Sequence, residues 1–146
     1  MKKILFMMMM LLVISGSCFA KGVSPVFAAG EKTCDSFVEG VVGSSSYSSL
    51  SGVLAPDFKK EFSADAYGKI REGIAKELGS KASSVSLIGF SRSLNVNDGT
   101  VPSDTYAYFC TFPNDKFALL SVVVVNDGGY SSVVGFNLSP LERNNK

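Results

Sequence analysis

The spacing of apolar residues changes at Gly79, and this change constrains the fold more than any other feature of the chain. Before Gly79, apolar residues recur every three or four positions, most clearly over 64–78, where Ser63 suits the N-cap position. After it, runs rich in Val, Phe, Tyr and Ser alternate with turn residues, as strands do. Helices followed by strands predict an α+β domain with its helices packed on one face of a sheet.

Four strands are expected after Gly79. They cover residues 83–94, 105–112, 116–125 and 130–138. The turn signals between them are Asn97-Asp98-Gly99, Pro113-Asn114-Asp115 and Asn126-Asp127-Gly128-Gly129. The last two are short enough for hairpins, so we expect a four-stranded antiparallel meander.

Helical segments are also expected before Ser63. The first begins with Thr33 as its N-cap and stops at Gly43, and its apolar face consists of Cys34, Phe37, Val38, Val41 and Val42. A serine-rich loop over 44–49 precedes a short helix near Leu50, and Pro56 starts a further turn. Residues 33–138 therefore form one domain between a flexible leader, 21–32, and a polar tail, 139–146.

Residues 1–20 have the pattern of a secretory signal peptide. Lys2 and Lys3 precede an apolar run over 4–14, and small residues then lead to a cleavage site between Ala20 and Lys21. A membrane-spanning helix needs about 20 apolar residues, so we expect no membrane span in the mature chain. Two alternatives stay open, cleavage near Ala28 and a lipoprotein anchored through Cys18.

Export fits the charge and the cysteine content. The full chain has a formal net charge of +1, and loss of Lys2 and Lys3 reverses its sign. Such a balance gives no electrostatic reason to bind nucleic acid. In the bacterial periplasm or outside the cell, Cys34 and Cys110 are expected to form a disulfide. The alternative is two buried free thiols.

The chain lacks the usual catalytic groups. It contains no histidine, which excludes Ser-His-Asp and Cys-His systems and histidine-ligated metals. A disulfide would leave the mature chain without a nucleophilic thiol, and most carboxylates fall in turns or on helix faces, where they cap or solvate. We therefore expect no catalytic residues, metal or cofactor, and we place Arg92 at a solvated strand edge.

Tyrosines and phenylalanines offer the best candidate site. In the second strand, Tyr106, Tyr108, Cys110 and Phe112 share one face. If Cys110 reaches Cys34, that face must look toward the helices. Tyr106, Tyr108, Phe112 and Tyr130 would then line the space between sheet and helices, either as a filled core or as an apolar cavity with hydroxyl groups for a ligand.

The order of these elements resembles a known family. Two or three helices, a Leu78-Gly79 helix end, four long strands and the run Phe58-Lys59-Lys60-Glu61-Phe62-Ser63 are similar to small secreted bacterial members of the nuclear transport factor 2-like (cystatin-like roll) superfamily. The resemblance spans residues 33–138 and implies helices folded against a curved sheet. The further strand that the superfamily's enzymes place among the helices is absent from this pattern.

These observations favour an exported, non-catalytic domain that binds a small apolar ligand or an envelope protein. One alternative is an enzyme of the roll superfamily with an aspartate base and a tyrosine donor, which requires an aspartate in contact with Tyr106, Tyr108 or Tyr130. The other is an inhibitor or immunity-type protein that acts through an exposed hairpin, for which a contiguous apolar surface patch would be evidence.

Overall fold

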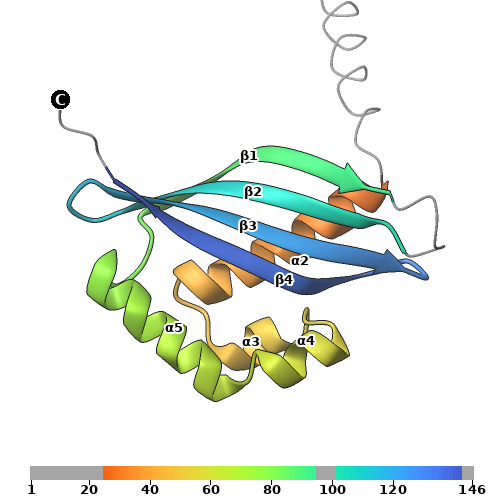
Figure 1. The fold of residues 1–146 in the computed structure, drawn as a ribbon, viewed down its shortest axis with the longest axis horizontal. Coiled ribbons are helices and arrows are strands. Elements are labelled where there is room, and N and C mark those ends of the chain that lie inside the picture. The colour runs from red at the N-terminus through yellow and green to blue at the C-terminus, as the bar shows by residue number, and fades with distance from the viewer. Residues whose placement is uncertain (1–24, 95–100, 143–146) are drawn as a thin grey trace, which may run out of the picture.

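A computed structural model describes residues 25–94 and 101–142, in which a layer of helices packs against one antiparallel sheet (Figure 1). The helices of this part are α2 (Pro25–Val42), α3 (Tyr47–Ser51), α4 (Pro56–Glu61) and α5 (Ala64–Glu77). The strands are β1 (Ser84–Ser93), β2 (Ser103–Phe112), β3 (Lys116–Asp127) and β4 (Tyr130–Leu141), paired in that order. The predicted α+β fold is confirmed. The signal peptide with its Ala20–Lys21 cleavage site, Cys18 and the 97–99 turn lie outside the described residues.

Helix α2 is longer than the sequence predicted. It begins at Pro25, so the predicted start at Thr33 is wrong, and residues 25–32 are helical rather than part of a leader. The extra turns are held by Phe27, whose ring lies 5.0 Å from that of Phe90, while its carbonyl accepts a 2.9 Å hydrogen bond from the Tyr106 hydroxyl. Thr33 does not cap the helix, because its hydroxyl donates to the Ser131 carbonyl instead.

The core lies between α2 and the middle of the sheet. The predicted apolar face of this helix is confirmed, because all five of its residues are buried. They pack under one face of β2, β3 and β4, and the α2 ribbon runs beneath the sheet in Figure 1. The buried residues of that face are Tyr106, Tyr108, Cys110, Phe112, Ala118, Leu120, Val122 and Val124.

Helix α5 begins and ends as predicted, and it is tied down at its middle and at its C-terminal end. The Ser63 hydroxyl accepts the Ala66 amide as N-cap, and Gly79 ends the helix with φ of +109°. At the middle of the helix, the Arg71 guanidinium donates to the Val41 carbonyl at 2.7 Å, at the end of α2. At its C-terminal end, the Lys116 amine donates to the Glu77 carbonyl.

Strand β4 forms one edge of the sheet and runs to Leu141, past the predicted end at Leu138. Residues 139–141 therefore belong to the sheet and not to the tail. Val133 exchanges two 2.8 Å backbone hydrogen bonds with Val53 and Ala55, which form a short parallel bridge on this edge. Pro56 then starts α4, so the chain leaves the edge after one bridge.

An ion pair with a buried carboxylate joins β1 and β2. Asp104 is the only fully buried charged residue in the described part of the chain. Its two oxygens accept hydrogen bonds from Arg92 Nε at 2.6 Å and Arg92 Nη2 at 2.7 Å, and Asn126 Nδ2 adds a third at 2.9 Å. Arg92 is thus bound across β1 and β2 and is not simply a solvated edge residue, although its side chain keeps 38% exposure.

We expect Asp104→Asn to lower the free energy of unfolding by about 2 kcal/mol, because the uncharged amide leaves Arg92 without its carboxylate partner. Urea denaturation would measure this change. The control is Asp57→Asn, which removes an exposed carboxylate bound to Lys60 at 2.7 Å and should leave stability unchanged within error. Equal losses in the two variants would contradict a specific role for the buried pair.

Candidate functional site

The aromatic residues predicted to line a cavity do not come together. Tyr106, Tyr108 and Phe112 are buried in contact with the core, at most 3% exposed, so the space between α2 and β2 is filled. Tyr130 is 81% exposed at the start of β4, directly after the Gly128–Gly129 turn. The filled-core alternative therefore holds for three of the four residues, and the fourth lies apart from them.

The predicted disulfide is also corrected. Cys34 and Cys110 are both buried, and both are free thiols. Cys34 lies on α2 and Cys110 on the helix-facing side of β2. Burial raises the pKa of Cys34 to about 12 and that of Cys110 to about 11, so neither thiol is a nucleophile near neutral pH.

One aspartate–tyrosine contact of the kind required by the enzyme alternative does occur. The Tyr108 hydroxyl donates to Asp35 Oδ1 at 3.0 Å. Asp35 is exposed on α2, but Tyr108 is only 3% exposed, and burial raises the pKa of its phenol well above the ordinary value. The hydroxyl is therefore held as a protonated donor to Asp35, and neither residue lines the groove described next.

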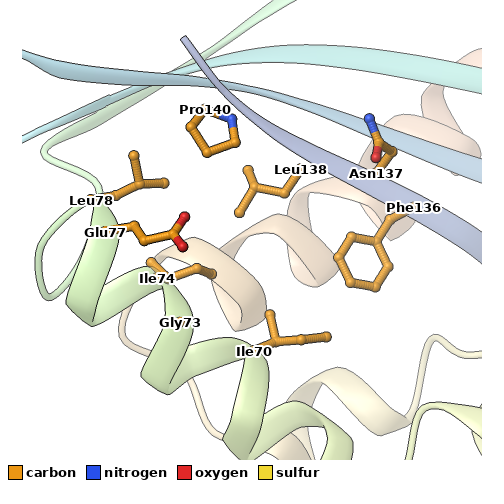
Figure 2. A pocket seen from close by; sticks show the side chains of 9 residues that line it. All are labelled: Ile70, Gly73, Ile74, Glu77, Leu78, Phe136, Asn137, Leu138 and Pro140. Carbon is orange, nitrogen blue, oxygen red and sulfur yellow. The ribbon is translucent and has the colours of Figure 1, made fainter. Parts of the chain in front are cut away.

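An apolar groove lies instead between α5 and β4 (Figure 2). Its volume is about 360 Å³, within the range of small-molecule sites. Helix α5 contributes one wall and β4 the other. The lining residues are Ile70, Gly73, Ile74, Glu77, Leu78, Phe136, Asn137, Leu138 and Pro140.

The groove exists because of a missing side chain and the way α5 is anchored. Gly73 lies in the middle of the α5 wall, and a Cβ added there would meet no atom within 4 Å. The Arg71 bond holds α5 at its middle and the Lys116 bond holds its C-terminal end, and neither bond closes the space beside Gly73. Phe136 and Leu138 on the opposite wall are only partly buried.

Polar groups are few in this groove. Glu77 is the only charged lining residue, and Figure 2 shows its carboxylate beside Ile74, turned toward the space between the walls. The Asn137 amide donates instead to the Ser139 hydroxyl at 2.9 Å. The site can therefore hold an apolar group and place a cation near one end, but it offers no acid–base pair.

Sequence reasoning did not identify this site. The helical spacing over 64–78 predicts an apolar face that includes Ile70, Ile74 and Leu78; Ile74 and Leu78 are buried, but Ile70 is only partly buried. Two signals pointed to it. Gly73 interrupts the helical segment, and the alternation of Phe136 and Leu138 continues to Pro140, past the predicted strand end.

Comparison of the chain with family models, with curated proteins and with solved structures finds no match. Over residues 25–94 and 101–142, no three His, Cys, Asp or Glu side chains gather where they could hold a metal ion. Within the same ranges, no helix has the length and apolar character needed to cross a membrane.

We expect iodoacetamide at neutral pH to leave Cys34 and Cys110 unmodified in the native protein, because both thiols are buried and protonated. Both should be alkylated in concentrated urea without reductant. Peptide mass spectrometry assigns the modified positions. A disulfide would instead protect both residues in urea until a reductant is added.

Stability should fall as the pH rises above about 9. Cys34 and Tyr106 each have a pKa raised to about 12, mainly by burial, against ordinary values of 9.0 and 10.0. The unfolded chain thus loses these protons first, so their contribution is complete below pH 9 and is lost as the pH approaches about 12. Urea titrations across this range would measure the slope, which Tyr106→Phe should make shallower; an unchanged slope would contradict the assignment.

Proposed function

We propose that this protein is an exported, non-catalytic binding domain that holds an apolar group in the groove between α5 and β4. The observation that carries the proposal is the groove itself. Apolar side chains from both walls line an open groove of about 360 Å³, and Glu77 is its only charged residue. Apolar pockets with a few polar groups at fixed places are typical ligand sites.

The placement of the reactive side chains supports binding rather than catalysis. The two thiols and the Tyr106 and Tyr108 phenols lie in the core with raised pKa values, away from the groove. Both oxygens of the buried Asp104 carboxylate are bound. The Asp35–Tyr108 hydrogen bond favours an enzyme as the second candidate, with Asp35 as base. The burial of Tyr108 counts against it, since a substrate has no access to the hydroxyl.

Export is part of the same proposal and is supported by the sequence of residues 1–20. The protein would then act in a bacterial periplasm or outside the cell, on a small apolar ligand or an envelope protein. The order of helices and meander also supports a relationship to nuclear transport factor 2-like rolls. An inhibitor or immunity-type role fits the same groove if its occupant belongs to a target protein.

The neutral dye N-phenyl-1-naphthylamine, whose fluorescence rises in apolar surroundings, should bind the protein. Gly73→Phe fills the groove, so the dye should bind at least about tenfold more weakly, a loss of about 1.4 kcal/mol. Fluorescence titration measures the affinity.

Gly68→Phe is the matched control. It makes the same change on α5, where an added Cβ also meets nothing within 4 Å, but residue 68 does not line the groove. Urea midpoints of both variants verify that they fold. The proposal fails if the dye does not bind the parent protein, or if the two variants bind it equally.

A further inference from the structure

We infer that the occupant of the groove is an extended segment of another polypeptide, which adds to the edge of β4 as a fifth strand. This inference rests on the proposed function and specifies what the apolar group belongs to. It rests on the backbone N–H and C=O groups of β4 along the groove, with which a free apolar molecule would form no hydrogen bonds. Strand addition at an open sheet edge is a common way to bind peptides.

The outer edge of β4 is paired at one point and open beyond it. Among the described residues, its backbone-to-backbone hydrogen bonds to a neighbour outside the sheet occur only at Val133, with Val53 and Ala55, and the Ser131 carbonyl also accepts the Thr33 hydroxyl. The bridge at Val133 has the hydrogen bonds of a parallel strand pair. Pro56 turns the chain away at the point from which a longer strand would continue along the groove.

The register of the sheet identifies the free backbone groups. Val133 opposes Val124, and after the irregularity that follows, Gly135 opposes Val123. In an antiparallel strand, the N–H and C=O groups of one residue point to one side of the strand, and those of the next residue point to the other side. The N–H and C=O groups of Phe136 and Leu138 therefore point away from β3, as those of Val133 do. Pro140 has no amide hydrogen and limits the pairing there.

The same residues direct their side chains into the groove. Phe136 and Leu138 oppose Val122 and Leu120, which are fully buried on the helix side of the sheet. A strand paired with them therefore places alternate side chains over α5, and the space beside Gly73 receives one of them. Glu77, further along the same wall, favours Lys or Arg two residues away in the bound segment.

The probe is the peptide acetyl-Ser-Val-Ser-Phe-Ser-Lys-Ser-amide, which should displace N-phenyl-1-naphthylamine from the parent protein. Two N-methylated isomers test the backbone pairing, one modified at Val and Phe and the other at the central serines. Because only one set of peptide amides faces β4, we expect one isomer to lose displacement and the other to retain it. Loss or retention in both isomers would overturn strand addition.

Glu77 gives an independent test. The lysine peptide should bind up to about fivefold more tightly than the same peptide with norleucine, and Glu77→Gln should remove this difference. Gly73→Phe should abolish direct binding of both peptides, measured by calorimetry without the dye, whereas Gly68→Phe should not. An equal preference for lysine in the Glu77→Gln variant would overturn the assigned cation position.

Other occupants give different results, and each would overturn the inference. Laurate is tested in the same assay: if it displaces the dye and neither peptide does, the site takes a lipid chain. If the dye binds a chain that starts at Lys21 but does not bind the full chain, the occupant is the segment 4–14. A dimer lost in Gly73→Phe would identify a second copy.

If the dye itself fails to bind, the proposed function fails, whereas dye binding without peptide binding leaves that function standing.

Discussion

The packing of α2 against β2, β3 and β4 is the interaction on which the rest of the structure depends. Phe37, Val41 and Val42 are completely buried in it, and each such side chain contributes about 1.5 to 3 kcal/mol. A hydrogen bond such as that from Tyr108 to Asp35 contributes only about 1 kcal/mol net. Apolar packing therefore sets where α2 lies on the sheet, and polar contacts form where that position allows them.

This balance explains which parts of the sequence could be interpreted in advance. Strand alternation correctly placed Tyr106, Tyr108 and Cys110 on the helix-facing side of β2, although the disulfide used to orient that face does not form. Periodicity identifies which face of an element is buried. It does not give the position of a helix along a strand, and whether two buried cysteines meet depends on that position.

The Arg92–Asp104 ion pair and the groove between α5 and β4 could not be predicted from the sequence, for a related reason. Arg92 and Asp104 meet because β1 and β2 pair them directly across the ladder, in a register that shifts at the irregularity between Leu87 and Gly89. The groove depends on the distance between α5 and β4, which belong to segments far apart in the chain. Sequence patterns predicted both walls as apolar surfaces, but the gap between them follows from tertiary anchoring by Arg71 and Lys116.

The open groove at the edge of β4 makes the fold less stable than the same fold with the groove filled and the edge paired. A larger residue in place of Gly73 would cover more apolar surface and improve helix propensity, since glycine costs about 1 kcal/mol relative to alanine in a helix interior. Continuation of the 53–55 bridge would pair the remaining edge of β4, but Pro56 prevents it. Gly73 and Pro56 thus leave side-chain space and free backbone groups at the same place, and an added strand is the one kind of occupant that uses both.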